Sequence, residues 1–179
     1  MDLERDIALI ESILFLENEP LAPETLQRIT GWNRERVVTA IESIQAEYRK
    51  DIHGMELLQL AGGYAFSPKQ PLWPELRPRY GKRNENRLSR AALETLSIIA
   101  YSQPITRQEI ESIRGVSADG MIKLLLSRNI IREVGRKDAP GKPVQYGTTK
   151  DFLKLFRLAS IADLPRMEEL DQERFERDE

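Results

Sequence analysis

The sequence repeats itself once, at a fixed offset of 84 residues. Residues 19–44 align without a gap on residues 103–128, and the two stretches match in chemistry more often than in identity. The matched pairs include Pro20 with Pro104, Leu26 with Ile110, Ile29 with Ile113, Gly31 with Gly115 and Ile41 with Leu125. Two copies at so long a period do not make a solenoid. The repeat therefore predicts a tandem pair of small units, each built as helix, turn, short helix, turn and helix.

Each copy is expected to continue into two short strands, because β-branched and aromatic residues follow its third helix. The predicted strands are 55–60 and 64–67 in the first copy, and 130–134 and 144–148 in the second. Gly62-Gly63 makes the turn of the first pair, and a loop over 135–143 joins the second. We therefore predict a mainly α fold with small β wings, an α+β protein of two tandem winged helix-turn-helix domains.

Capping residues predict where the helices begin and end. Thr106 and Glu109 have the spacing of a capping box, and Gly115 lies where a C-cap glycine is expected. Pro23 suits the first turn of a short helix, where a missing N–H is harmless. The other predicted N-caps are Asn33, Ser89, Ser117 and Thr149, the last before a helix with Phe152, Leu153 and Phe156.

These signals divide the chain into four parts. We expect an N-terminal winged-helix domain at 1–68, a proline-rich basic linker at 69–87, a C-terminal winged-helix domain at 88–164 and an acidic tail at 165–179. The linker is expected to be ordered or semi-extended. The tail has few apolar residues to anchor it, so we expect it to be disordered or only partly helical.

Composition excludes several classes of protein. Cysteine is absent, which rules out disulfides and thiolate chemistry. A content of 40% hydrophobic and 31% charged residues fits a soluble globular protein. The start at Met1-Asp2-Leu3-Glu4-Arg5 is acidic, and no apolar run reaches the about 18 residues of a membrane span. We therefore expect a cytoplasmic protein without a membrane partner.

Catalysis, cofactors and metals are not expected. His53 is the single histidine and precedes Gly54 in a predicted exposed turn. It has no second histidine or cysteine with which to share a metal. Glu109 and Glu111 are two residues apart, so they lie on different faces of one helix. We predict no catalytic residue, no cofactor and no metal site.

A helix-turn-helix pattern raises the question of DNA reading, which needs exposed basic or polar side chains at the start of the third helix. Residues 117–127 contain a single cation, Lys123, among apolar residues spread around the helix. Arg34 and Arg36 of the first copy are interleaved with acidic residues. The net charge is −6 over 1–68, +5 over 69–90, +3 over 91–164 and −4 over 165–179. We expect DNA binding to be weak and non-specific at most.

The loop at 135–143 carries three candidate phosphate contacts, Arg136, Lys137 and Lys142. The alternative is a solvated turn with ordinary surface charges, because Pro140-Gly141 is a standard type II turn pair and needs no ligand.

Several long motifs resemble the family of segregation and condensation protein B. They are the run 88–101 with Gln103-Pro104-Ile105-Thr106, the run Ile113-Arg114-Gly115-Val116, and the loop 135–143 with Tyr146-Gly147-Thr148-Thr149. The resemblance covers about residues 5–164 and is strongest from Leu88 to Leu158. It implies two winged-helix domains, a homodimer formed mainly through the N-terminal domains, and no enzymatic activity. It also implies binding to a kleisin, segregation and condensation protein A, which bridges the SMC ATPase of bacterial condensin at the nucleoid.

Two surfaces are candidates for these partners. The opening helix, about 3–17, has more apolar residues than a small core can bury, so we expect a second chain to cover part of it. The predicted dimer contacts are Ile7, Ile10, Leu14 and Val38, and the predicted kleisin contacts are Tyr101, Leu126, Tyr146 and Phe156. The alternatives are that the linker and second domain cover the helix, and that each of the four kleisin candidates belongs to its own core.

Two hypotheses on function remain. The first is a dimeric, non-catalytic adaptor subunit of condensin that supports chromosome condensation and segregation. The second is a winged-helix transcription regulator that reads DNA. Sequence-selective binding to duplex DNA that persists at physiological salt would favour the regulator.

Overall fold

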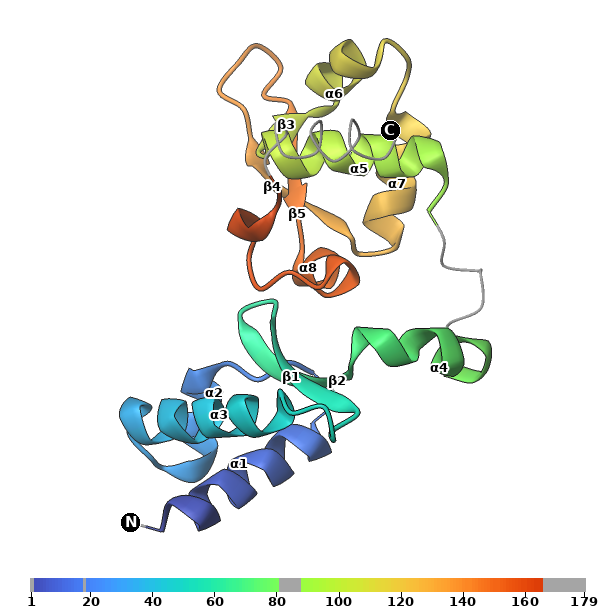
Figure 1. Cartoon of the computed structure of the whole chain (residues 1–179). Coiled ribbons are helices and arrows are strands. Elements are labelled where there is room, and N and C mark those ends of the chain that lie inside the picture. The colour runs from blue at the N-terminus through green and yellow to red at the C-terminus, as the bar shows by residue number, and fades with distance from the viewer. Residues whose placement is uncertain (1, 18, 81–87, 166–179) are drawn as a thin grey trace.

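The computed structural model describes residues 2–17, 19–80 and 88–165. Within them the chain forms two halves, and in each half three helices precede an antiparallel hairpin (Figure 1). The first half contains α1 (Leu3–Leu16), α2 (Pro23–Thr30), α3 (Arg34–Tyr48), β1 (Met55–Leu60), β2 (Gly63–Pro68), η1 (Gln70–Leu72) and α4 (Trp73–Tyr80). The second contains α5 (Arg90–Ser102), β3 (Ile105–Thr106), α6 (Arg107–Arg114), α7 (Asp119–Ser127), β4 (Ile131–Arg136), β5 (Val144–Thr148), α8 (Lys150–Phe156) and η3 (Ile161–Asp163). The predicted repetition of elements is therefore confirmed, and the fold mixes helices with small antiparallel sheets.

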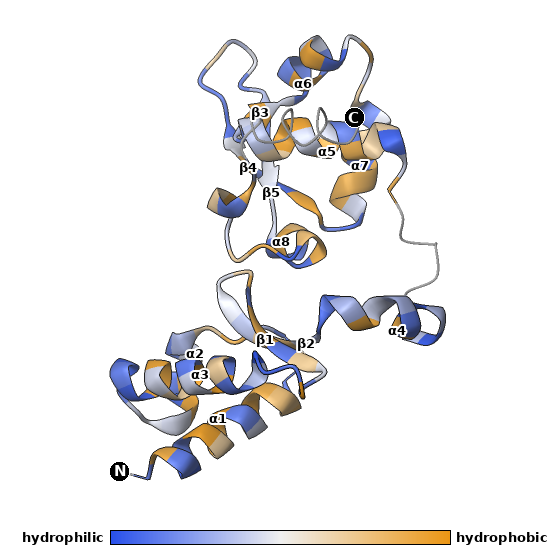
Figure 2. Ribbon diagram, in the orientation of Figure 1, coloured by the Kyte–Doolittle hydropathy of each residue, from blue (hydrophilic) through white to orange (hydrophobic). Residues whose placement is uncertain are grey.

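Each half has its own hydrophobic core. α1 carries hydrophobic residues along its length, and those on one side pack on α3 (Figure 2). The fully buried side chains of the first core include Ile10, Leu26, Val37, Ile41 and Ile44. Those of the second include Leu96, Ile99, Ile110, Leu125 and Ile131. Burial of each such side chain contributes about 1.5–3 kcal/mol, so each half has its own source of stability.

The second helix of each half ends in the same way. Gly31 after α2 and Gly115 after α6 have φ angles of 73° and 71°, in the left-handed region that favours glycine. These two residues are equivalent in the repeat, so the repeat conserves a backbone geometry as well as a hydrophobic pattern. The capping box of Thr106 and Glu109 and the N-caps at Asn33, Ser89 and Thr149 are also confirmed.

The predicted N-cap at Ser117 is wrong. α7 begins at Asp119, and Ala118 precedes it without a side-chain cap. The carboxylate of Glu111, on α6, accepts hydrogen bonds from the Ala118 backbone N–H at 3.0 Å and from the Ser117 hydroxyl at 3.1 Å. An acidic side chain on the preceding helix thus satisfies the start of α7, which a local capping pattern does not reveal.

The linker was expected to be ordered or semi-extended, and its first part is ordered. η1 and α4 occupy residues 70–80. Pro74 falls in the first turn of α4, where a proline is tolerated. The side chains of Leu72, Trp73 and Leu76 line an apolar groove of about 550 Å³ against the hairpin. Residues 81–87, and the tail over 166–179, lie outside the described residues.

In the second half, β5 lies between β3 and β4 in a three-stranded antiparallel sheet. Ile105 and Thr106 pair with Tyr146 and Gln145, which ties the turn after α5 to the sheet. β4 extends to Arg136, two residues beyond the predicted end, because a bulge between 133 and 135 lets the strand continue beside β5.

The halves meet at the tip of the β1–β2 hairpin, which lies against the chain after α8 (Figure 1). The backbone N–H groups of Ala61 and Gly62 donate to the carbonyl oxygens of Leu158 and Ala159, both at 2.9 Å. Peptide hydrogen bonds of this kind fix the hairpin tip relative to the second half.

Side chains add to this junction. Arg157 donates to the hydroxyl of Ser67 at 3.1 Å, and its guanidinium lies 5.5 Å from the centre of the Trp73 ring. Lys154 forms an ion pair with Glu19, which lies at the start of the segment leading to α2. Contacts from two parts of the first half therefore converge on α8 and the residue that follows it.

Candidate functional site

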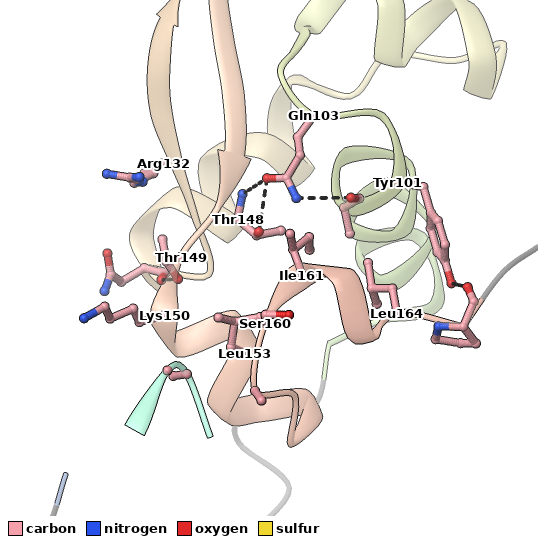
Figure 3. A pocket seen from close by; sticks show the side chains of 16 residues that line it. Tyr101, Gln103, Arg132, Thr148, Thr149, Lys150, Leu153, Ser160, Ile161 and Leu164 are labelled. Carbon is pink, nitrogen blue, oxygen red and sulfur yellow. Dashed lines mark hydrogen bonds between the residues drawn. The ribbon is translucent and has the colours of Figure 1, made fainter. Parts of the chain in front are cut away.

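A groove of about 1110 Å³ runs beside this junction (Figure 3). Its walls come from the hairpin tip of the first half and from α5, β5, α8 and η3 of the second. The lining residues are Ala61, Gly62, Ala100, Tyr101, Gln103, Asn129, Arg132, Thr148, Thr149, Lys150, Leu153, Ala159, Ser160, Ile161, Leu164 and Pro165. Because both halves contribute, the groove in this form depends on how the halves are joined.

Gln103 organises one wall of the groove. Its Oε1 accepts hydrogen bonds from the backbone N–H of Thr148 at 2.7 Å and from the Thr148 hydroxyl at 3.1 Å, and its Nε2 donates to the carbonyl of Ala100 at 3.1 Å. A Cβ atom at Gly147 would lie 2.9 Å from Gln103 Oε1, so glycine permits this approach. Two of the motifs that carry the family resemblance therefore meet here, where they join α5 to β5.

The predicted kleisin contacts do not gather at one point in the groove. Of the four, Tyr101 is the one found among the described lining residues, and its hydroxyl donates to the Pro165 carbonyl at 2.7 Å. Leu126 and Tyr146 are half-buried and pack against the second core. Phe156 is 42% exposed, and its ring centre lies 4.8 Å from that of Phe152. Tyr101 and Phe156 are thus the members of this set with the most surface available to a partner.

The second candidate surface is the outer side of α1. Phe15 and Leu16 are 80% and 77% exposed, and Leu9 is 43% exposed, although all three are large apolar side chains. Leu9 and Leu16 are seven residues apart, which places them on the same side of the helix. Large apolar side chains grouped in this way on a surface mark a site of contact with another molecule.

Two of the four predicted dimer contacts lie in the core of their own half. Ile10 and Leu14 are 0% and 3% exposed, because they form the stripe of α1 that packs on its own core. Their side chains are therefore covered before a second chain arrives. Ile7 and Val38 are half-buried and stay predictions. Phe15 and Leu16 follow the core stripe in sequence but lie outside it, and they were not among the predicted contacts.

The basic residues of the third helices are engaged within the chain. Arg36 donates from Nε and Nη2 to both carboxylate oxygens of buried Asp6, each at 2.6 Å, and stacks 4.1 Å from the Trp32 ring centre. This guanidinium holds the pKa of Asp6 below its usual value. Arg34 pairs with Glu24 at 2.9 Å, so the start of α3 presents paired charges.

On α7, Lys123 pairs with Asp119 at 2.8 Å. The apolar residues around this helix are buried or half-buried, as Ile122, Leu125 and Leu126 show. Neither third helix therefore presents the row of available basic and polar side chains that reads base edges.

The wing loop between β4 and β5 is tied to α6. Lys137 forms an ion pair with Glu109, the capping-box residue, while the guanidinium of Arg136 donates to the Lys142 carbonyl at 3.1 Å. Thr106 donates its backbone N–H at 2.9 Å and its hydroxyl at 2.7 Å to Glu109. Lys137 first, then Thr106, hold the pKa of Glu109 at about 2. Arg136 and Lys142 remain exposed, and their contact with phosphate stays a prediction.

The Glu109 carboxylate is expected to make the stability of the folded chain depend on pH in the acidic range. Its pKa is about 2 in the folded chain, against an ordinary value of 4.5, so its contribution is fully present above about pH 4.5 and is lost as the pH falls toward 2. Replacement of Glu109 with glutamine should flatten that part of the curve of melting temperature against pH. Circular dichroism melts between pH 2 and 6 check this; parallel curves for the two proteins would contradict it.

His53 belongs to a cluster of polar and aromatic side chains that contact one another at the end of α3. The His53 ring lies 4.7 Å from Tyr48 and 3.3 Å from the Glu47 carboxylate, and is half-buried rather than exposed as predicted. Tyr48 donates its hydroxyl to Glu11, which raises the pKa of Tyr48 to about 12.

Within the described ranges no three His, Asp or Glu side chains gather to hold a metal ion. None of the helices that the structure describes is long and apolar enough to cross a membrane.

Comparison with known proteins identifies the class to which such a chain belongs. The family model for the segregation and condensation complex subunit ScpB matches residues 8–167, so the class is that of subunits of this complex. Segregation and condensation protein B of Acetivibrio thermocellus is 40% identical over 169 residues, which cover 94% of this chain and 85% of that protein. The chain belongs to the segregation and condensation protein B family.

The chain is also similar to a second member of the family and to a solved structure. The Myxococcus xanthus member of the family is 39% identical over 169 residues, and the chain spans about half of its length, 51%. A crystal structure of a dimer of a ScpB N-terminal domain complexed with a ScpA peptide is 22% identical, with a TM-score of 0.42; it covers 45% of this chain and 93% of that one.

Proposed function

We propose that the chain is a non-catalytic adaptor subunit of bacterial condensin. In this role it binds the kleisin, segregation and condensation protein A, and through the kleisin it joins the SMC ATPase at the nucleoid in the cytoplasm. The observation that carries the proposal is the family match over residues 8–167, together with 40% identity to a curated member over nearly the whole chain. Chromosome condensation and segregation is the process that this subunit would support.

We assign the fold to two tandem winged-helix domains, at 1–68 and 88–164. Support comes from the separate cores, from the repeated order of three helices and a hairpin, and from the equivalent left-handed glycines after α2 and α6. The segment 69–87 then connects the domains, and its first part is helical.

The apolar side of α1 is the proposed homodimer contact. Leu9, Phe15 and Leu16 supply exposed apolar area there, and half-buried Ile7 and Val38 are neighbouring candidates. The stripe of Ile10 and Leu14 acts indirectly, because it fixes α1 on its own core and so orients the outer side.

For the kleisin, the second half offers Phe156 and Tyr101 as exposed aromatic side chains. Leu126 and Tyr146 are half-buried candidates that pack against the second core. Aromatic side chains of this kind often dominate binding energy at an interface. A helix of the kleisin that docks by its apolar side is the expected mode of contact.

Replacement of Phe156 with glutamate is expected to weaken kleisin binding at least about tenfold, because a charge would replace an aromatic contact. The binding constant is measured by calorimetry with purified segregation and condensation protein A. Ile113→Glu is the matched control, since Ile113 is 60% exposed on α6, and it should leave the affinity unchanged. Equal affinities for wild type and Phe156→Glu would remove Phe156 from the interface, and no binding by the wild type would contradict the adaptor function.

A further inference from the structure

An apolar groove, the α4 groove, lies between α4 and the base of the first hairpin. Its volume is about 550 Å³, and its lining residues are Gly54, Met55, Pro68, Leu72, Trp73, Leu76 and Tyr80. On α4, Trp73, Leu76 and Tyr80 repeat at helical spacing, so one side of the helix lines the groove. Tyr80 is nevertheless 73% exposed, and α4 buries none of its own residues. The described part of the chain therefore leaves this apolar surface open to a partner.

The α4 groove and the last turn of α1 lie at the same end of the first half. Tyr48, the last residue of α3, donates its hydroxyl to Glu11 on α1, and its ring centre lies 4.7 Å from that of His53. Gly54, next to His53, lines the groove. In Figure 1, the end of α1 lies beneath the base of the hairpin, and α4 follows from that base. The groove therefore continues the exposed apolar surface of α1.

α1 alone falls short of the apolar area that a dimer contact needs. A stable interface buries about 800 Å² per partner, and about 65% of it is apolar in homodimers, which makes roughly 520 Å². Phe15, Leu16 and Leu9 are 80%, 77% and 43% exposed, so together they amount to about two fully exposed side chains. A large aromatic side chain buries about 150–250 Å² and a leucine less, so these three supply about 300–400 Å². The remainder must come from a neighbouring apolar surface.

The charges beside the two surfaces are complementary. Arg77 and Arg79, in the last turn of α4, are exposed and fall on either side of the stripe that lines the groove, at 3.6 residues per turn. The last turn of α1 contains no basic residue and is followed by exposed Glu17. An apolar groove flanked by cations suits an apolar helix end that is followed by a carboxylate.

We propose that, in the homodimer, the last turn of α1 from each copy inserts Phe15 and Leu16 into the α4 groove of the other copy. The inference rests on the α1 contact proposed above and specifies the surface that this contact meets. A two-fold axis makes the exchange reciprocal, so both apolar surfaces of both copies are covered. Glu17 then lies beside Arg77 and Arg79 of the partner subunit, and α4 is part of the dimer interface.

The test uses the full chain, whose lack of cysteine allows single cysteines at chosen positions. Leu16→Cys is mixed with Met55→Cys, since Met55 is 38% exposed and lines the groove. The two proteins carry tags of different mass, are left to exchange subunits, and are then treated with a short bismaleimide. We expect the main crosslinked product to be a mixed dimer with one chain of each variant, whereas Leu16→Cys alone should give less.

Ile113→Cys replaces Met55→Cys in the matched control, because Ile113 is 60% exposed on α6, and this mixture should give no mixed dimer. A main product that joins two Leu16→Cys chains would overturn the inference and leave the α1 contact in place. Absence of any crosslinked dimer would also overturn it, and the mass of one copy by light scattering would then remove the α1 contact as well.

A second measurement does not depend on crosslinking. Tyr80→Asp places a carboxylate in the α4 groove and should raise the dimer dissociation constant at least about tenfold, because an aromatic contact would be replaced by a charge. Tyr80 packs in neither core, so the chain should remain folded, which circular dichroism checks. A dissociation constant equal to that of the wild type, measured by sedimentation velocity, would contradict a role of the groove in the dimer.

Discussion

Replacement of Gly63 with alanine is expected to unfold the first half of the chain at a much lower denaturant concentration than the wild type. Gly63 begins β2 and is buried where the segment before α2 crosses the hairpin. A Cβ atom there would lie 2.7 Å from the carbonyl carbons of Pro20 and Leu21, and 2.8 Å from the Pro20 oxygen. These are backbone atoms, so no side chain can turn aside to relieve the contact.

The displaced segment would also lose its pairing with the hairpin. Leu21 and Tyr64 exchange two backbone hydrogen bonds, at 3.0 Å and 2.8 Å, which a shift of the segment breaks. Overpacking costs about 1–3 kcal/mol and each of the two hydrogen bonds about 1 kcal/mol, so we expect a loss of roughly 3–5 kcal/mol in the free energy of unfolding.

Tryptophan fluorescence during urea unfolding measures this effect in the right place, because both tryptophans, Trp32 and Trp73, lie in the first half. The matched control is Gly120→Ala, in α7, where an added Cβ would meet nothing within 4 Å. Alanine favours a helix, so this control should be neutral or slightly stabilising. A Gly63→Ala protein with the wild-type midpoint would show that the segment at 20–21 does not lie against the hairpin.

Charges placed on the outer side of α1 are expected to convert the protein from dimer to monomer. Phe15→Asp/Leu16→Asp would put two carboxylates where the proposed contact needs apolar side chains. We expect the dimer dissociation constant to rise at least about a hundredfold, since two buried contacts of 1.4 kcal/mol or more would be lost. Neither side chain belongs to the core, so the dissociated chain should remain folded. A thermal melt should therefore still show its unfolding transition.

Sedimentation velocity over a range of concentrations measures the change in association. Ile113→Asp is the control, because Ile113 is 60% exposed but lies on α6, in the second half. It should keep the wild-type association. Dissociation by Ile113→Asp alone, or an unchanged dimer with both α1 charges, would place the contact elsewhere.

Much of the fold could be predicted because its signals are local. The capping box at Thr106, the N-cap at Asn33 and the glycine at 115 each depend on a few neighbouring residues, and each is confirmed. The 84-residue repeat added a second view of the same unit, so a strong signal in one copy supported a weaker one in the other.

The predictions that failed depend on contacts between distant or differently oriented elements. Glu111 reaches across a turn to satisfy the start of α7, which made the cap at Ser117 unnecessary. α4 is helical despite its prolines, and its Trp73 and Leu76 line a groove with Gly54, Met55 and Pro68. A local pattern contains neither contact.

The candidate surfaces were predicted less well than the fold, for a related reason. The hydrophobic pattern of α1 showed an excess of apolar residues but could not separate the side that packs on α3 from the side that remains outside. Ile10 and Leu14, two of the predicted dimer contacts, lie on the side that packs on its own core, whereas Phe15 and Leu16 lie outside it. The junction at Ala61 and Gly62 could not be predicted from the sequence, because it consists of backbone hydrogen bonds between the halves.

We propose that exposed apolar surface makes this chain a partner-binding subunit. Light scattering coupled to size-exclusion chromatography tests it most directly, on the purified chain alone and mixed with segregation and condensation protein A from the same organism. We expect the mass of two copies for the chain alone and a single heavier peak that contains both proteins in the mixture. A chain with the mass of one copy that elutes separately from the kleisin would contradict it.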